Sequence, residues 1–295
     1  MGRVIAITGS SGLVGTQLRE ALRGRGDQVI RLRRGSPKGP RERQWNPQGE
    51  TDPKALEGVD AVIHLAGESI NQRWTDGARK RIHDSRALGT ASIAKAVAAQ
   101  DKPPALICAS AVGYYGADRP EPVREDDAPG SDFLAQVCVD WEAAADPARE
   151  AGARVCHMRL GVVLSASGGA LEAMLLPFKL GLGGPIGSGR QPFAWVHLAD
   201  AADAFLWALD GQHLGAVNVV APERIDNRTF TETLASTLRR PAFMRVPKGP
   251  VKLVLGEMGD ALLLSGQNVV PGVLEDAGFA FGYPTIKAAL NSELA

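Results

Sequence analysis

Short apolar runs rich in β-branched residues alternate along the first half of the chain with longer segments of helical periodicity. The runs that predict strands are Arg3–Thr8, Gln28–Leu32, Ala61–Leu65, Ala105–Ala109 and Arg154–Leu160. The segments that predict helices are Leu13–Arg23, Asp76–Ala99, Asp132–Glu150 and Ala170–Leu180. Such alternation is typical of βαβ units, and near-continuous apolar strands indicate a parallel sheet covered on both faces. We therefore predict an α/β fold.

The alternation loosens after about residue 165. A stretch rich in glycine and proline, Gly181–Pro192, precedes an apolar run at Phe193–Leu198 and a predicted helix at Ala199–Leu209. From Arg240 onward, short apolar segments are separated by proline and glycine. We expect a first domain mainly over residues 1–165 and a smaller lobe mainly over 166–295, with segments near 190–220 returning to the first domain.

Composition and charge exclude several classes of protein. Lys and Arg total 33 and Asp and Glu total 33, and a general nucleic-acid binder would be basic instead. No apolar run approaches the ~20 residues that span a bilayer, and the segment Met1–Ala6 lacks the layout of a signal peptide. Cys108, Cys138 and Cys156 are widely spaced, as in reduced cytoplasmic thiols, and no His or Cys spacing predicts a metal site. We expect a cytoplasmic protein without metal, membrane or nucleic-acid partners.

A glycine cluster with the spacing G-x-x-G-x-x-G lies between the first predicted strand and the first predicted helix. Glycine at Gly9, Gly12 and Gly15 permits a tight turn, and backbone N–H groups there can approach a diphosphate at the helix N-terminus. The alternative is a plain tight turn between strand and helix. The residues expected to bind the cofactor here are Gly9, Ser10, Ser11, Gly12, Leu13, Val14 and Gly15.

The end of the second strand indicates which dinucleotide is bound. An NAD site has Asp or Glu there for the ribose hydroxyls, whereas this chain has Arg33 and Arg34 and no acidic residue. Guanidinium groups suit a 2′-phosphate, so we predict NADP(H), with Arg33 and Arg34 as contacts. The alternative is a solvated basic loop, since Lys38, Arg41 and Arg43 follow.

Several longer stretches carry a family resemblance. They are the glycine cluster, His64–Gly67, Asn71–Trp74, Asp84–Arg86, Ala109–Gly116, Leu176–Gly189, and in the tail Leu255–Met258, Gly266–Gln267, Ala277–Phe279 and Tyr283–Pro284. Together they resemble an atypical extended short-chain dehydrogenase/reductase of the YfcH-type family, which is labelled NAD-dependent epimerase/dehydratase and carries its own C-terminal domain. The resemblance covers essentially the whole chain. It implies a Rossmann-type, doubly wound parallel sheet with a smaller C-terminal substrate lobe, and it says little about the substrate.

The usual chemistry of that superfamily depends on Tyr-x-x-x-Lys in the helix after the fourth strand. The tyrosine transfers a proton, and the lysine lowers the tyrosine pKa and holds the ribose. Here the matching helix has Phe133 and Val137, so we expect this dyad to be absent. Tyr283 and Lys287 have the right spacing, but they lie at the far end of the chain and Pro284 disfavours helix at Tyr283.

Three hydroxyl groups are candidates to replace the dyad. Ser110 follows the fourth strand, where the superfamily has a serine that binds the substrate carbonyl. Tyr114 and Tyr115 follow on a glycine-flanked loop, and adjacent side chains point in different directions, so at most one faces the cofactor. The alternative for each is an ordinary loop residue. The catalytic candidates are thus Ser110, Tyr114 and Tyr115, and the proton donor stays open.

Further site residues follow from their position after the predicted strands. The additional candidates for contact with the cofactor are Leu65, Ala66, Gly67, Arg86 and Ser110. Glu68, Arg73 and Arg190 are candidates for contact with substrate, and surface ion pairs are the alternative. The loop Gly181–Gly189 is an anion-binding nest, a flexible cover or a structural hairpin.

Two functions of different kinds fit these features. One is an NADP(H)-dependent oxidoreductase or epimerase acting on a small polar substrate, with nucleotide sugars as candidates. The other is a non-catalytic NADP(H)-binding sensor or partner-binding protein, which the missing dyad favours. Phe133, Val137 and Trp141 form a helical stripe that fits either the core or a dimer face, so a homodimer is compatible with the sequence.

Overall fold

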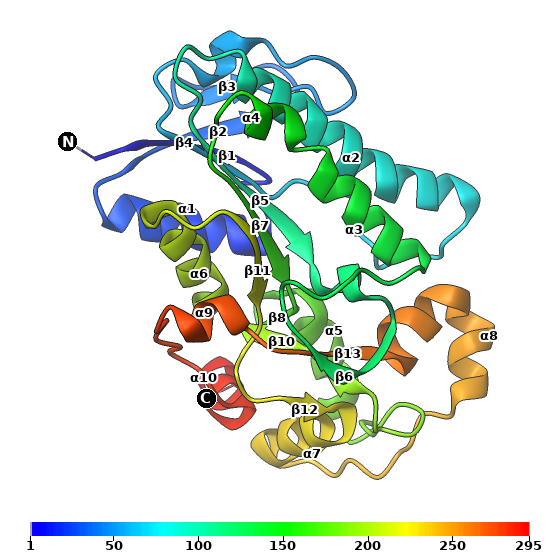
Figure 1. The fold of residues 1–295 in the computed structure, drawn as a ribbon. Helices are drawn as coiled ribbons and strands as arrows, with labels where there is room; N and C mark the ends of the chain where they lie inside the picture. Colours follow the sequence, from blue (N-terminus) through cyan, green and yellow to red (C-terminus); the bar gives the residue numbers. More distant parts are fainter. Residues whose placement is uncertain (1, 295) are drawn as a thin grey trace.

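A seven-stranded sheet forms the centre of the computed structural model, which describes residues 2–294 (Figure 1). In spatial order its strands are β11 (Gly215–Val219), β7 (Val155–Leu160), β5 (Ala105–Ala111), β4 (Ala61–His64), β1 (Val4–Thr8), β2 (Gln28–Arg33) and β3 (Glu42–Gln44). Every neighbouring pair is parallel. The order runs outward in both directions from β1, so the predicted Rossmann-type, doubly wound α/β fold is confirmed.

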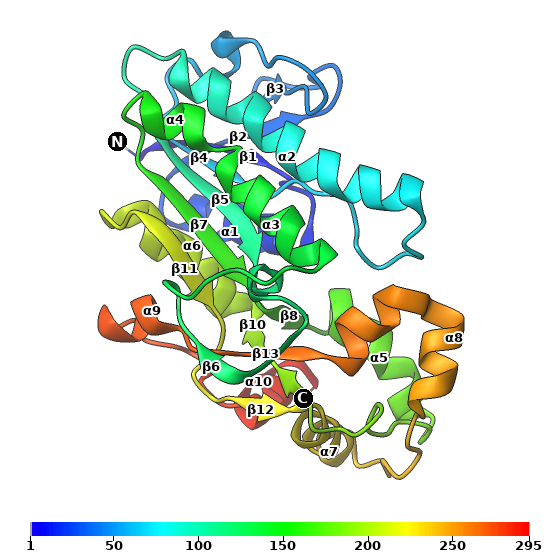
Figure 2. The same ribbon diagram turned by 45° about the vertical axis from the view of Figure 1, so that its right-hand side comes forward.

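Helices cover both faces of this sheet. The first face carries α1 (Leu13–Gly24) and α6 (Leu198–Asp210), and the second carries α2 (Asp76–Ala98), α3 (Phe133–Ala143) and α4 (Asp146–Glu150) (Figures 1 and 2). Successive residues of β1 alternate between the two cores: Ile5 and Ile7 pack in one and Ala6 in the other. A strand buried on both faces has to be apolar throughout, which is why these strands are visible as unbroken apolar runs.

Two details of the sheet domain differ from the sequence prediction. The helix expected over Asp132–Glu150 is two helices, α3 and α4, because Pro147 at the start of α4 cannot continue a helix from α3. The edge strand β3 was not expected, whereas β11 lies within the segments near 190–220 that were expected to return to the first domain. β3 has only three residues, all of them polar or charged, so it carries no hydrophobic signal.

A second lobe lies beyond the carboxyl ends of the strands (Figure 1). Its strand pairs are β8 (Val162–Ser165) with β10 (Trp195–His197), β9 (Pro192–Phe193) with β12 (Ile225–Asp226), and β6 (Asp118–Val123) with β13 (Gly266–Val269). Its helices are α5 (Gly169–Lys179), α7 (Asn227–Leu238), α8 (Lys248–Gly259), α9 (Gly272–Asp276) and α10 (Ile286–Leu294). Short helical turns occur at Pro53–Leu56, Val112–Tyr115 and Asp260–Leu264. Among the described residues, no helix is long and apolar enough to span a membrane.

The lobe is assembled from distant segments around one apolar core. Trp195 of β10, Phe230 of α7 and Leu290 of α10 are all buried in it. Conversely, β6 lies early in the chain yet pairs with β13, and β11 lies late yet joins the central sheet. Segments from both sides of residue 165 thus contribute to each part of the fold, and a domain boundary near that residue stays a prediction.

Asp200 of α6 anchors the C-terminal segment. Its carboxylate is 1% exposed and accepts hydrogen bonds from the backbone N–H groups of Gly282 at 2.7 Å and Tyr283 at 2.9 Å. The cap of α6 is a different residue: Nδ1 of His197 accepts the N–H of Ala199 at 3.1 Å. The acidic residue near the start of α6 thus connects the tail to the sheet domain.

Replacing Asp200 with alanine should lower the free energy of unfolding by about 2–4 kcal/mol, because a buried carboxylate and its two charge-assisted hydrogen bonds from backbone N–H groups are lost. Urea denaturation measures the change. Asp203→Ala, on the exposed side of the same helix, is the matched control and should change stability by less than about 0.5 kcal/mol. Equal effects of the two substitutions would contradict the anchoring role.

Candidate functional site

A cleft of about 340 Å³ lies at the carboxyl ends of β1, β4, β5 and β7. β2 lies on one side of β1 and β4 on the other, so the strand order reverses its direction at β1. Doubly wound sheets bind ligands at the carboxyl ends of the strands where this reversal occurs. The residues lining the cleft are Gly9, Gly12, Leu13, Val14, Gly15, Leu65, Ala109, Leu160, Val162, Val163, Gly169 and Ala170. None of these side chains is charged.

The glycine turn forms one wall of the cleft. Gly9 has a φ of +63°, and a Cβ added there would lie 2.8 Å from the carbonyl carbon of Leu65. A Cβ on Gly15 would lie 2.4 Å from the carbonyl oxygen of Gly9. Both contacts are too short for a side chain, so these glycines are required by the close approach of β1, α1 and β4.

The N-terminus of α1 is open toward the cleft. Gly12 is its N-cap without a side chain to bond the first turn, and that turn holds no acidic residue. Within the described part of the chain, the N–H groups of Leu13 and Val14 have no acceptor. Free N–H groups at the positive end of a helix favour an anion, so this wall fits the diphosphate of a dinucleotide.

Thr8 and His64 fix the two strand ends beneath the turn. Oγ1 of Thr8 lies 2.8 Å from Nδ1 of His64 and accepts the N–H groups of Leu65 at 3.1 Å and Ala66 at 3.3 Å. Burial lowers the pKa of His64 to about 4, so its ring is neutral at physiological pH. His64 is therefore a positioning residue beneath the cleft.

The two predicted phosphate contacts, Arg33 and Arg34, lie at the end of β2. Nη1 of Arg33 binds Oε2 of Glu42 on β3 at 2.8 Å, and Arg34 is exposed. The hydrogen bond from Arg33 is the main cause that lowers the pKa of Glu42. Arg33 thus has one carboxylate partner in the structure, whereas Arg34 is free of any within the described residues.

Arg31 is a third cation at this edge, which the sequence analysis did not single out. Its Nη1 lies 3.2 Å from Oε1 of Glu42, and its Nε donates to Oγ of Ser10 at 3.4 Å. Arg19 of α1 donates to the carbonyl oxygen of Ser10 at 2.9 Å, and burial together with the charge of Arg31 lowers its pKa. The signal for Arg31 was the strand alternation, which places it on the same face of β2 as Arg33.

The Ser110 hydroxyl points away from the cleft. Its side chain is 2% exposed and donates to Oε1 of Glu142 on α3 at 2.7 Å. The preceding residue, Ala109, is the one that lines the cleft. This corrects the expectation that Ser110 presents its hydroxyl to cofactor or substrate.

The Tyr115 hydroxyl is likewise held inside the protein. The side chain is fully buried, donates to Oδ1 of Asn218 at 2.7 Å and accepts from Nη1 of Arg159 at 2.9 Å. Burial raises the pKa of Tyr115 to about 12. Tyr115 is thus poorly placed to transfer a proton to a ligand in the cleft, contrary to expectation.

Arg159 of β7 connects these groups. It binds both carboxylate oxygens of Glu142, at 2.8 and 2.9 Å, and its guanidinium carbon lies 3.5 Å from the ring centre of Tyr114. Burial raises the pKa of Glu142, but the hydrogen bonds and charge of Arg159 outweigh it and leave that pKa below its usual value. Of the three catalytic candidates, only Tyr114 has a hydroxyl without a hydrogen bond to another described residue.

The remaining candidates lie outside the cleft lining. Ser11 is exposed on the glycine turn, and Arg73 and Arg190 are exposed. The Glu68 carboxylate lies 3.8 Å from Nε of Arg81, and Gln72 donates to it. Ala66 and Gly67 continue from Leu65, and Gly67 lies against the Arg86 guanidinium.

The second glycine-rich loop uses its own backbone donors. The N–H groups of Ile186, Gly187 and Gly189 bind Oδ1 of Asn227, the carbonyl of Val246 and the carbonyl of Ile186, at 2.9, 2.9 and 3.0 Å. Donors that are already bonded cannot form an anion nest. Of the three alternatives for Gly181–Gly189, the structure favours the structural hairpin.

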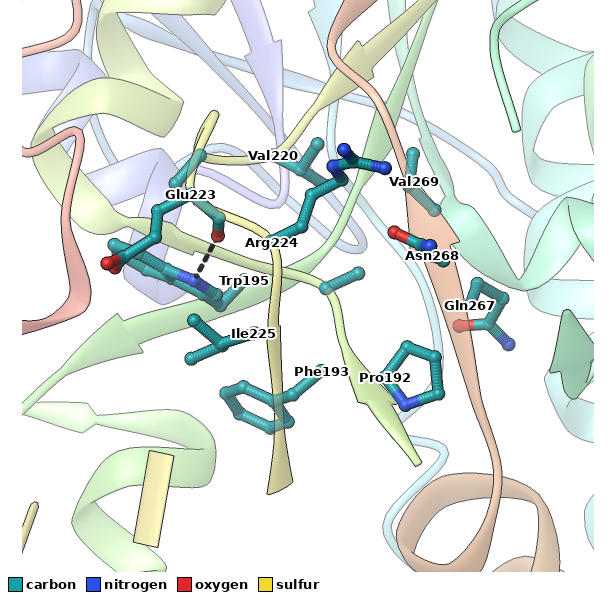
Figure 3. Close-up of a pocket in the computed structure, with 12 residues that line it drawn as sticks. Pro192, Phe193, Trp195, Val220, Glu223, Arg224, Ile225, Gln267, Asn268 and Val269 are labelled. Carbon is teal, nitrogen blue, oxygen red and sulfur yellow. Dashed lines mark hydrogen bonds between the residues drawn. The ribbon is translucent and has the colours of Figure 1, made fainter. Parts of the chain in front are cut away.

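A second, smaller pocket lies in the lobe between β9, β10, β12 and β13 (Figure 3). Nε1 of Trp195 donates to the carbonyl of Glu223 at 3.1 Å, and the amides of Gln267 and Asn268 donate to backbone carbonyls of Gly116 and Pro120. Its polar groups are thus largely used within the protein, and we interpret it as a packing seam. Within residues 2–294 no group of three or more His, Cys, Asp or Glu side chains is arranged to hold a metal.

Comparison with known proteins gives a consistent result. Residues 5–220 match the model of the NAD dependent epimerase/dehydratase family, and residues 246–293 match a domain of unknown function, DUF1731. Epimerase family protein Mb2239 of Mycobacterium bovis is 44% identical over 291 residues, which is 98% of this chain and 96% of that protein. Human epimerase family protein SDR39U1 is 37% identical and covers 99% of both chains.

Two solved structures extend the comparison. Human SDR39U1, crystallised with NADPH, has a TM-score of 0.89 and 35% identity, with 99% of each chain covered. A nucleoside-diphosphate sugar epimerase from Corynebacterium glutamicum has a TM-score of 0.84 and 37% identity, covering all of this chain and 58% of the other. The similarity therefore extends over the sheet domain and the lobe together.

Gly15→Ala should lower the free energy of unfolding by about 1–3 kcal/mol, because the new methyl group would collide with the carbonyl of Gly9. Gly24→Ala, in the last turn of the same helix, meets nothing within 4 Å and should be neutral or slightly stabilising. Thermal melting without ligand compares them. If both variants melt together, the close approach at Gly15 does not constrain the turn.

Glu142→Gln should reduce the free energy of unfolding at neutral pH by about 3–5 kcal/mol, because Arg159 would be left buried without its counterion. A carboxylate with a lowered pKa in the folded state adds stability above its unfolded pKa of about 4.3, and that stability is lost as pH falls through the folded pKa. The variant should therefore lose less stability than the wild type below about pH 4.3. Urea denaturation at a series of pH values measures the change, with the exposed Glu150→Gln as control. If the stabilities of Glu142→Gln and the wild type changed with pH in parallel, the prediction would be wrong.

Proposed function

The chain belongs to the NAD dependent epimerase/dehydratase family, and from this premise we propose that it is an NADP(H)-dependent oxidoreductase or epimerase acting on a small polar substrate. The observation that carries the proposal is the open N-terminus of α1 beside three arginines, Arg31, Arg33 and Arg34, with one carboxylate, Glu42, among them. A diphosphate and a 2′-phosphate are the anions that this pair of sites accommodates. The human relative solved with NADPH supports the same cofactor.

The residues that would hold each part of the cofactor follow from the cleft. The N–H groups of Leu13 and Val14 would bind the diphosphate, and the β2 arginines would bind the 2′-phosphate. The apolar wall at Leu65 and Ala109 would exclude water from the nicotinamide half. When bound, the nicotinamide supplies hydride transfer, and the protein supplies position and electrostatics.

Proton transfer in this enzyme would not use the usual dyad. The helix after β5, α3, contains neither tyrosine nor lysine, and Phe133 instead packs against Trp74 with ring centres 5.3 Å apart. Tyr114 is the candidate that keeps an unbonded hydroxyl near the end of β5. A nucleotide sugar is one substrate class to test, since the C. glutamicum relative is described as a nucleoside-diphosphate sugar epimerase.

A second candidate function is a non-catalytic NADP(H) sensor or partner-binding protein. It is favoured by the Ser110 and Tyr115 hydroxyls, which are bonded to Glu142 and Asn218 rather than directed to the cleft. A cytoplasmic location and a homodimer stay predictions under either function. Of the stripe Phe133, Val137 and Trp141, the last two are buried in the core and Phe133 is half-buried, which supports the core interpretation of the stripe over a dimer face.

The cofactor assignment predicts selective stabilisation. In thermal-shift titrations, NADPH and NADP⁺ should raise the melting temperature more than NADH and NAD⁺; a ligand at 100 times its Kd adds about 2.7 kcal/mol. Arg33→Ala/Arg34→Ala should weaken NADPH binding far more than NADH binding, because only NADPH carries the 2′-phosphate. Arg31→Ala should also weaken NADPH binding more than NADH binding if Arg31 contacts the 2′-phosphate.

Equal losses for NADPH and NADH would overturn the arginine assignment, and no shift with any of the four would overturn the cofactor proposal. Once binding is established, oxidation of NADPH by a panel of carbonyl compounds and nucleotide sugars separates the two candidate functions. Turnover that Tyr114→Phe abolishes and Tyr115→Phe preserves would support the enzyme. NADPH that binds but is never oxidised would favour the sensor.

A further inference from the structure

Arg86 of α2 is a partly buried cation whose hydrogen bonds go to backbone carbonyls. Its Nη1 donates to two backbone carbonyls, those of Glu68 at 3.0 Å and Ile82 at 3.1 Å. Within residues 2–294 it forms no ion pair, whereas the buried arginine of this region, Arg159, is bound to Glu142 on two sides. Burial lowers the pKa of Arg86, yet a guanidinium stays protonated at physiological pH.

A buried charge without a counterion is costly, and carbonyl dipoles offset only part of that cost. Only Nη1 of Arg86 is used in these bonds, so its remaining N–H donors can bind a ligand that has acceptor oxygens. Gly67 lies beside the group: a Cβ built there would be in ordinary contact with the guanidinium carbon, at 3.4 Å. Gly67 follows directly on Leu65 and Ala66, at the end of the strand whose Leu65 lines the cleft.

The guanidinium lies between the loop after β4 and helix α3. Its carbon is 5.0 Å from the ring centre of Trp141, one turn beyond Val137. Cys138 also lies close to Arg86. Burial raises the pKa of this thiol to about 12, and the positive charge of Arg86 offsets part of that rise. In the family that this chain resembles, the lysine of the dyad would be at Val137 of α3. Here the positive charge near this position comes from Arg86 of α2 instead.

A dinucleotide in the cleft would place its nicotinamide half on this side. The arginines that suit the 2′-phosphate lie on β2, so the adenosine half belongs on the β2 side of β1. The other half then extends over the ends of β4 and β5, where Leu65 and Ala109 line the cleft. Arg86 lies behind the first of these strand ends.

We infer that Arg86 takes the place of the absent lysine as the cation that binds the nicotinamide half of NADP(H), through the hydroxyl groups of its ribose. This rests on the proposed function and adds a role for Arg86 within that site. A guanidinium has donors but no proton to release at neutral pH, so Arg86 binds and orients and does not act as an acid. A proton for the substrate would come from another group.

The test compares two ligands that share the 2′-phosphate. NADPH has both halves of the dinucleotide, whereas adenosine 2′,5′-bisphosphate lacks the nicotinamide half. Isothermal titration should show that Arg86→Met weakens NADPH by about 10- to 100-fold, the loss of one or two hydrogen bonds to a charged group. Binding of adenosine 2′,5′-bisphosphate should change by less than about twofold, within the ordinary effect of a distant substitution.

Two further variants control for the fold and the charge. Arg86→Lys keeps the charge and should recover part of the NADPH affinity, and Arg81→Met, on the exposed face of the same helix, should leave both ligands unchanged. Arg31→Ala should weaken both ligands, since it lies at the 2′-phosphate end. Thermal melting without ligand shows which variants are folded, and Arg86→Lys serves as the main variant if Arg86→Met is not.

The outcomes are distinguishable. The role of Arg86 is overturned, while the proposed function stands, if Arg86→Met leaves NADPH affinity unchanged or weakens both ligands equally. If the wild-type protein binds neither ligand, the proposed function fails and this inference fails with it. Selective loss of NADPH, with partial recovery in Arg86→Lys, is the result that supports it.

Discussion

The close approach of β1, α1 and β4 is the constraint on which the site depends. Gly9 touches the backbone of Leu65, and Gly15 touches the carbonyl of Gly9, so neither position tolerates a side chain. This approach brings the open end of α1 over the ends of the central strands and leaves its N–H groups facing a cleft instead of a neighbouring element. Thr8 and His64 hold the strand ends in register from below. An anion site at this place is therefore a consequence of backbone packing, and the surrounding side chains only select which anion enters.

A chain of buried hydrogen bonds connects α3 with β11. Arg159 binds Glu142, which accepts a hydrogen bond from the Ser110 hydroxyl. Arg159 also donates to the Tyr115 hydroxyl, which in turn donates to Asn218 of β11. Each bond satisfies a group that would be costly to leave unpaired, so the chain ties α3, β5, β7 and β11 into one rigid unit. The same bonds turn two hydroxyls away from the cleft. The bonds that hold these elements together therefore also set the direction of the Ser110 and Tyr115 hydroxyls.

Much of the sheet was predictable because strands buried on both faces must be apolar, and the first five predicted strands are β1, β2, β4, β5 and β7. The short polar strand β3 was not predictable, since pairing at a sheet edge leaves no hydrophobic pattern. The break between α3 and α4 was not predicted either, although Pro147 marks it in the sequence. The glycine turn was readable from spacing alone. The direction of Ser110 was not, because it depends on Glu142, 32 residues later in the sequence. Arg31 was not predicted because its part in this edge depends on Glu42 of the unpredicted strand β3, which binds both Arg31 and Arg33.

The distribution of charge around the cleft explains how a chain of zero net charge can form a site for a highly charged ligand. Lys and Arg balance Asp and Glu over the whole sequence, and most arginines near the sheet have carboxylate partners. Near the cleft, Arg31 and Arg33 share Glu42, Arg34 has no carboxylate partner among the described residues, and Arg86 donates only to carbonyls. Between them the lining is apolar, which strengthens the field of the few unpaired charges. A ligand with anionic groups at one end and hydroxyl groups at the other matches that pattern, whereas a neutral or short ligand would leave at least one of the cations uncompensated.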